Sequence, residues 1–210
     1  MGTPAGRRAY DSLRRTDQAH RTKAEIAQAA RRLFTANGWA ATTIREVARE
    51  AGVAVPTVYA AYGNKTGLAL ALSDAAHDES DLPAEIAALE AAQGDPAAQL
   101  AAMAGFDRRL FERSGDLILM LREAGRAEPE LAPVYRDGRR RADAFRAEVF
   151  GSWPEGTLQA GVAESVDVYA ALCNIDAFRT LTAERSWSPD RIEAWWAGLL
   201  ARELLAPALG

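Results

Sequence analysis

The chain has 210 residues, a formal net charge of −4 and one cysteine, Cys173. This length allows one large or two small domains, and no apolar run reaches the ~18 residues that cross a bilayer. A single cysteine excludes a disulfide within the chain, and the start of the chain lacks the apolar stretch of a secretory signal. We therefore expect a cytoplasmic protein without a membrane segment. Abundant alanine and leucine favour an all-α fold.

The charge is unevenly distributed along the chain. Residues 1–72 carry 11 Lys and Arg against 5 Asp and Glu, a net charge of +6, whereas residues 73–210 carry −10. A basic first third on an acidic remainder predicts that the first third meets a polyanion. We interpret residues 1–20 as a flexible basic arm. Such an arm either reaches along a phosphate backbone or has no role, and the sequence leaves both interpretations open.

Two short helices are predicted after the arm. The first covers about 22–37, where Gly38 can close it, and its apolar positions have helical spacing: Ile26, Ala30, Leu33 and Phe34. The second begins after the Thr42-Thr43 pair, which can cap it, and ends at Gly52 after about two turns. Two helices this short bury little surface by themselves, so they need a third element to pack against.

The stretch VAVPTVYAAY, residues 53–62, provides that third element. Pro56 is harmless in the first turn of a helix. Val58, Ala61 and Tyr62 then face inward at helical spacing, while the outward side chains stay short or polar. A short helix packed on a preceding helix through a glycine turn predicts a helix-turn-helix, whose second helix lies in the major groove of DNA.

Lys65 begins a fourth predicted helix, over about 65–80, with Asn64 as its cap. A cation in the first turn opposes the helix dipole at a cost of roughly 0.3–1 kcal/mol. That cost becomes a gain when a phosphate binds there, because the free backbone N–H groups also favour an anion. The alternative is a solvated lysine that the position merely tolerates.

The run from Thr43 to Leu68, TIREVAREAGVAVPTVYAAYGNKTGL, resembles the TetR family of bacterial transcriptional regulators. The matching features are Thr43, the Val-Ala pair, Ala-Gly-Val, Thr-Val-Tyr, a second aromatic residue and a lysine, in this order. Residues 186–206 also resemble the last helix of many members. The resemblance implies a helix-turn-helix domain over 21–66 and a helical ligand-binding and dimerisation domain over 67–210.

By position, the resemblance implies a set of DNA contacts: Thr43, Arg45, Val55, Pro56, Thr57, Tyr59 and Lys65. Arg45 would pair with guanine, and Lys65 would bind phosphate. Ala54 departs from the family pattern, in which a serine often caps the third helix, and Ala61 stands where a histidine is frequent. Both departures weaken the expected affinity or specificity, and we interpret Tyr62 as a core residue.

The rest of the chain predicts further helices over about 84–93, 97–113, 117–125, 130–150, 164–184 and 189–206, with a loop over 151–161. In the family this region encloses a ligand pocket. Our candidates for its lining are Met103, Phe106, Leu110, Met120, Arg122 and Tyr135. Met and aromatic residues at helical spacing also occur in ordinary cores, and this alternative stays open. An apolar lining with a few charges predicts a small, partly apolar effector that the sequence does not name.

The last two predicted helices carry apolar stripes too wide for ordinary surface helices. The resemblance implies that they pair with those of a second copy in a four-helix bundle. The predicted interface residues are Leu172, Ile175, Trp195, Trp196 and Leu199. The alternative is packing within one chain. We interpret Cys173 as a small buried apolar residue.

We therefore expect a ligand-responsive regulator, most simply a repressor. It would bind a near-palindromic double-stranded DNA operator as a homodimer, and an effector would release it. We expect no cofactor, no metal and no catalytic residue, since His20 and His77 are isolated and no phosphate loop or nucleophile motif occurs. An enzyme is one alternative, and an adaptor with a degenerate DNA-binding domain is another.

Overall fold

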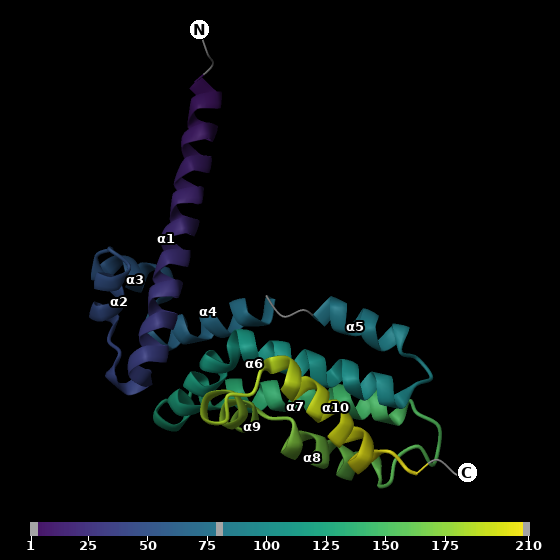
Figure 1. Cartoon of the computed structure of the whole chain (residues 1–210). Coiled ribbons are helices and arrows are strands. Elements are labelled where there is room, and N and C mark those ends of the chain that lie inside the picture. Colours follow the sequence, from purple (N-terminus) through teal and green to yellow (C-terminus); the bar gives the residue numbers. More distant parts are fainter. Residues whose placement is uncertain (1–3, 79–81, 208–210) are drawn as a thin grey trace. The chain divides into compact units, whose positions relative to one another are not determined.

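The computed structural model describes residues 4–78 and 82–207 (Figure 1). In these two ranges the regular elements are helices, apart from one antiparallel bridge between Leu158 and Leu205. The all-α prediction is confirmed. Over the same ranges, none of the helices combines the length and the apolar character that crossing a membrane requires.

The elements follow one another in this order: α1 (Pro4–Ala41), α2 (Ile44–Glu50), α3 (Val55–Tyr62), α4 (Lys65–Asp78), α5 (Leu82–Ala91), α6 (Pro96–Ala127), α7 (Ala132–Gly151), α8 (Val162–Leu172), α9 (Ile175–Arg179), the π-helical turn η1 (Thr180–Glu184) and α10 (Pro189–Leu204). The chain divides into two compact units, residues 1–75 with 120–132 and residues 76–119 with 133–210. The first unit therefore includes most of α4 and the end of α6. Our predicted boundary at 66/67 placed both in the other domain.

The first unit is built on α1, with α2 and α3 beside its lower half (Figure 1). Its core contains one apolar face from each helix: Ile26, Ala29, Ala30 and Phe34 of α1, Ile44, Val47 and Ala48 of α2, Val58 of α3, and Leu68, Ala69 and Leu72 of α4. Helices of seven or eight residues are unstable alone, so this shared burial holds α2 and α3 in place.

The start of α1 differs from our prediction. Residues 4–20, which we expected to form a flexible arm, continue α1 without a break as far as its closing turn. From Ala9 to Ala36 the sequence has neither glycine nor proline and is rich in alanine and arginine, which are good helix formers. The predicted end is confirmed, because Gly38 leaves the helix with φ +79°.

The second unit surrounds a core to which α6, α7, α8, α9 and α10 all contribute. Trp196 and Tyr169 are its largest fully buried side chains. A polar cluster lies within it. Arg146 donates to both carboxylate oxygens of Asp107, at 3.3 and 3.0 Å, and the Tyr169 hydroxyl donates to the same carboxylate at 3.0 Å. Burial raises the pKa of Asp107, and the neighbouring Arg146 opposes that rise.

We predicted two helices over 97–113 and 117–125, but α6 is one helix from Pro96 to Ala127. The gap between the two predicted helices is Ser114-Gly115-Asp116, which the structure includes in α6. Gly115 instead serves packing: a Cβ there would lie 2.7 Å from Cδ1 of Ile175. The glycine lets α9 pack closely on α6, and this contact offsets the poor helix propensity of glycine.

The opposite error occurs over 164–184, which we predicted as one helix. The structure divides it into α8, α9 and η1. Asn174 is extended (φ −136°, ψ 165°), and its side chain accepts a hydrogen bond from the Ala177 amide, so it caps a new helix. Cys173 is buried beside this break, as expected. The predicted end of the fourth helix, at about residue 80, falls on residues 79–81, which lie outside the described residues.

Candidate nucleic-acid interface

The short helix α3 presents one outward face. Pro56, Tyr59 and Ala60 are exposed at i, i+3 and i+4, and Tyr59 keeps 50% of its surface accessible. Thr57 and Val55 are half-buried at the edges of this face. Apart from Tyr59 the side chains are short, so a surface laid against α3 can approach its backbone closely. Such a face suits the shape of a DNA major groove.

The turn before α3 is tight. Gly52 has φ +66°, a conformation that favours glycine, and the Val53 amide donates to the Ala48 carbonyl at 2.9 Å. Val58 faces inward and is almost completely buried. At the far end of α3, the Tyr62 hydroxyl donates to the Lys23 carbonyl at 2.7 Å. Tyr62 is thus half-buried against α1, at the edge of the core and not within it as we interpreted.

Thr43 and Arg45 begin α2. The Thr43 hydroxyl oxygen accepts from the Glu46 amide at 3.2 Å, and the Thr43 amide donates to the Glu46 carboxylate at 2.8 Å. This reciprocal pair is a capping box. Hydrogen bonds from Thr43 also hold the pKa of Glu46 below its ordinary value. Thr43 is therefore first a structural cap, whereas the exposed Arg45 is free to reach a ligand.

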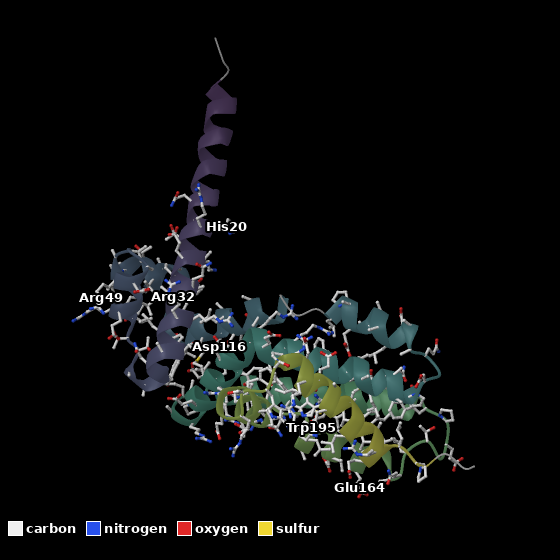
Figure 2. All side chains as sticks on the ribbon, viewed as in Figure 1. His20, Arg32, Arg49, Asp116, Glu164 and Trp195 are labelled. Atoms are coloured by element: carbon white, nitrogen blue, oxygen red, sulfur yellow. The ribbon has the colours of Figure 1, made fainter. Side chains whose placement is uncertain are left out.

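Arg49 is a residue that our sequence reasoning did not select. It lies four residues after Arg45, on the same side of α2. Its exposed side chain extends away from the neighbouring helices in Figure 2. The two arginines give the helix before α3 a basic outer edge. The i, i+4 spacing of two arginines on a short helix was the signal available in the sequence.

Lys65 is in a different environment from the one we expected. It is half-buried, its ammonium donates to the carbonyl oxygen of Trp39, and Nζ lies 4.2 Å from the centroid of the Trp39 ring. The other predicted features of this turn are confirmed, since Asn64 caps α4 by accepting from the Gly67 amide at 2.7 Å. A phosphate contact from Lys65 stays a prediction. The ammonium already has a partner within the chain.

The residues predicted to line a ligand pocket fall in both units. Met103, Phe106, Leu110 and Tyr135 belong to the second unit, whereas Met120 and Arg122 belong to the first. Met103 and Met120 are buried, and the other four are half-buried. Met103 is part of the core cluster of the second unit, which agrees with the alternative of ordinary core packing. The pocket itself stays a prediction.

Two of the predicted dimer residues need correction. Trp196 has no exposed surface and Ile175 only 3%, because their own chain covers them. Trp196 packs against Phe111 and Phe178, with ring centroids 6.1 and 6.3 Å apart. A partner chain cannot touch these two side chains without unfolding the core. Leu172 and Leu199 are half-buried, and Trp195 keeps 38% of its surface exposed on α10, so these three remain candidates (Figure 2).

Within residues 4–78 and 82–207, excepting the side chains of 4–17, 77 and 78, no group of three or more His, Cys, Asp or Glu is placed to hold a metal ion.

Comparison with known proteins agrees with this geometry. Residues 26–72 match the family model described as bacterial regulatory proteins, tetR family. Over 70 residues the chain is 40% identical to the HTH-type transcriptional regulator TtgR of Pseudomonas putida, and equally to the probable regulator ArpR of the same species. Each match covers 33% of this chain and 33% of the relative, so the chain aligns with about a third of their length.

The similarity to solved structures extends over nearly the whole chain. A transcriptional regulator of Saccharomonospora viridis in complex with choline has a TM-score of 0.71 at 17% identity, over 90% of this chain and all of that one. A tetR-family protein from Rhodococcus has a TM-score of 0.70 at 22% identity, over 89% and 98%. At these identities the similarity establishes the fold alone.

Proposed function

We propose that this chain, which belongs to the tetR family of bacterial regulatory proteins, is a transcriptional regulator that reads duplex DNA with α3. The observation that carries the proposal is the outward face of α3, short-chained apart from the exposed Tyr59 and held by α1 and α2. The net charge of +6 over residues 1–72 supports it, because DNA binding draws much of its affinity from phosphate neutralisation.

In this proposal each residue has a distinct role. Tyr59 and Thr57 contact bases or backbone in the major groove, and Val55 and Pro56 meet thymine methyl groups. Arg45 reaches a guanine, where a bidentate pair contributes about 1–3 kcal/mol of discrimination. Thr43 and Lys65 lie at the starts of α2 and α4, where free backbone N–H groups favour phosphate.

We propose further that the regulator acts as a homodimer. Two copies would place two α3 helices in successive major grooves, about 34–36 Å apart, on a near-palindromic operator. Leu172, Trp195 and Leu199 are the contact candidates, since their side chains keep surface accessible on α8 and α10. Two contacting α8–α10 pairs, one from each chain, would form the bundle that the sequence predicts.

A repressor released by an effector is the form of regulation we propose. The effector would bind the second unit near Phe106, Leu110 and Tyr135, which are half-buried rather than sealed in the core. It would release DNA only by binding better to the conformation that fits DNA less well. The choline complex of the S. viridis protein supports a small-molecule effector for a protein of this fold.

The test is an in vitro selection, in which the purified chain retains duplexes from a random library at ~0.15 M salt, a physiological ionic strength. We expect a palindrome with half-sites about one helical turn apart. Absence of enrichment by a folded protein would remove the proposal. Affinity for the selected duplex is then measured for the Tyr59→Ala and Arg45→Ala variants.

Arg140→Ala is the matched control for these variants. It removes the same charge as Arg45→Ala from the exposed surface of the second unit, where Arg140 pairs with Asp137. We expect Arg45→Ala to lower the affinity for the selected duplex about 5- to 150-fold and to relax the base preference at one base pair in each half-site. The control should change affinity little. A loss that is uniform over all sequences would make Arg45 a phosphate contact instead.

A further inference from the structure

Buried side chains form a cluster at the end of α1. The proposed DNA contacts of α3 do not account for this cluster. Gly38 interrupts the helix, and the Trp39 ring that follows is buried against Phe34, with ring centroids 5.2 Å apart. The last carbonyls of any helix lack partners along the helix and carry partial negative charge. Here the buried Thr42 hydroxyl lies 3.1 Å from the Leu33 carbonyl oxygen and 2.9 Å from that of Gly38.

Lys65 adds a side-chain partner to the Trp39 carbonyl, which also accepts from the Thr42 amide at 3.3 Å. Its ammonium donates to the Trp39 carbonyl and stands over the Trp39 ring, with the Phe34 ring at 5.9 Å. A cation over an aromatic face is stabilised further when it is partly removed from water. Lys65 thus joins the first turn of α4 to the last turn of α1.

An acidic group of α6 lies beside the same point. The Glu123 carboxylate faces Gly38 so closely that a Cβ on Gly38 would lie 3.4 Å from its Oε1. Burial lowers the pKa of Lys65, and the charges of Glu128, Glu123 and Glu46 oppose that change. All these residues belong to the first unit, so the ammonium has a negative environment of its own before any DNA arrives.

We propose that Lys65 is a positioning residue that clamps α4 to the end of α1, and that Glu123 competes with a DNA phosphate for its ammonium. This inference rests on the proposed DNA binding. An ammonium has three N–H donors, of which the Trp39 carbonyl takes one. A phosphate at the start of α4 would take another, and Glu123 would repel that phosphate while it lowers the effective charge of Lys65. The end of α6 thereby sets DNA affinity without touching DNA.

The competition is tested with the Glu123→Gln variant and its matched control Glu130→Gln. Both remove one exposed negative charge from the same segment, but Glu130 is not among the acids that act on Lys65. The probe is a fluorescein-labelled mixed-sequence DNA duplex, with binding followed by anisotropy over a range of salt. We expect Glu123→Gln to bind about threefold more tightly, and Glu130→Gln to change affinity less than twofold. Equal effects of the two substitutions would overturn the competition.

The clamp has a second test that needs no DNA. Denaturant unfolding of the wild type, Lys65→Met, Glu123→Gln and the double variant gives a double-mutant cycle. We expect Lys65→Met to lower the unfolding midpoint and to abolish the effect of Glu123→Gln on stability. An unchanged midpoint for Lys65→Met would overturn the clamp. Additive effects of the two substitutions would overturn the coupling of Glu123 to Lys65. If the wild type binds no duplex while Lys65→Met lowers the midpoint and the cycle is non-additive, the proposed DNA binding is overturned, and the clamp and its coupling to Glu123 stand.

Discussion

We predicted Trp196 at a dimer interface, but the structure places it in the core, and this difference has a large consequence for stability. Its side chain has no exposed surface and contacts Phe111 and Phe178. A tryptophan buries about 200 Å², and at about 25 cal/mol per Å² its complete burial contributes about 5 kcal/mol. Alanine keeps a small part of this contribution but leaves a cavity, so we expect Trp196→Ala to lower the free energy of unfolding by about 4 kcal/mol.

The indole nitrogen of Trp196 makes the prediction sharper. Its N–H is buried and has no hydrogen-bond acceptor among the described residues. An unpaired buried donor costs about 1–3 kcal/mol, so phenylalanine would lose ring area but also remove that cost. We expect Trp196→Phe to stay within about 1 kcal/mol of the wild type, since the two effects offset each other. A loss comparable to that of Trp196→Ala would show that the N–H is satisfied in solution.

The assay is denaturant unfolding at several protein concentrations, because dimerisation would itself make stability depend on concentration. Trp195→Ala is the contrasting variant. Trp195 is 38% exposed and stacks edge-to-face on Trp187 at 5.7 Å, so its loss should cost the protomer about 1 kcal/mol. We expect Trp195→Ala, rather than Trp196→Ala, to weaken self-association in sedimentation. An unchanged unfolding midpoint for Trp196→Ala would refute the core assignment.

Three further predictions concern single positions. Gly67→Ala should lower stability and DNA affinity together, measured by unfolding and anisotropy, because a Cβ there would overlap the Tyr62 carbonyl oxygen and force the α3–α4 turn open. Asp107→Asn should lower the free energy of unfolding by about 3 kcal/mol, since Arg146 loses its buried partner; the control Asp137→Asn, opposite an Arg140 that is 71% exposed, should cost at most about 0.5 kcal/mol. Burial raises the pKa of the Cys173 thiol, so iodoacetamide should modify it only on unfolding, and rapid labelling of the native protein would contradict its placement in the core.

The sequence predicted the first unit well because its signals are local. Thr43 as a cap, Gly52 and Gly38 as turn residues and Pro56 in a first turn each depend on the conformation of neighbouring residues only. All four have the predicted roles in the structure. Helical spacing alone likewise predicted that Tyr59 points outward. A short amphipathic helix has few other ways to bury its apolar side.

The second unit was harder to predict because its breaks depend on distant residues. Gly115 looks like a helix end until Ile175, sixty residues later, is seen to pack against it. Asn174 looks like one polar residue in an apolar helix until its side chain is seen to cap α9. The apolar stripe of α10 could not show which side a partner covers. In the structure Ile192, Trp196, Leu200 and Leu204 face inward, and Trp195 does not.

Lys65 shows the same limit in the candidate site. A family pattern supplies the residue and its position, but the contact with Trp39 joins residues 26 positions apart. Nothing in the N-G-W sequence before α2 indicates that the Trp39 carbonyl, which accepts from the nearby Thr42 amide, also accepts from a distant cation. The predicted cost of a lysine in the first turn of α4 is therefore offset inside the protein, by a carbonyl at the negative end of α1, even before a phosphate binds.

Ala54 lies at the N-cap position of α3, and a substitution there tests how much a side-chain cap would stabilise the helix. The residue has the extended conformation of an N-cap but no side chain to accept a hydrogen bond. A serine would accept from the Thr57 amide, because Pro56 has no N–H, yet that amide already donates to the Ala54 carbonyl at 2.9 Å. We therefore expect Ala54→Ser to raise the free energy of unfolding by only about 0.5 kcal/mol, the low end for a cap.

Ala60→Ser, on the exposed face of the same helix, is the matched control and should lower stability by about 0.5 kcal/mol through helix propensity. The two serine substitutions are thus expected to change stability in opposite directions. They lie only six positions apart, at the N-cap and on the exposed face of one short helix. Unfolding midpoints of both variants, measured beside the wild type, decide the matter. Should Ala54→Ser destabilise the protein as Ala60→Ser does, position 54 would not act as a cap, and the start of α3 would lie later than Val55.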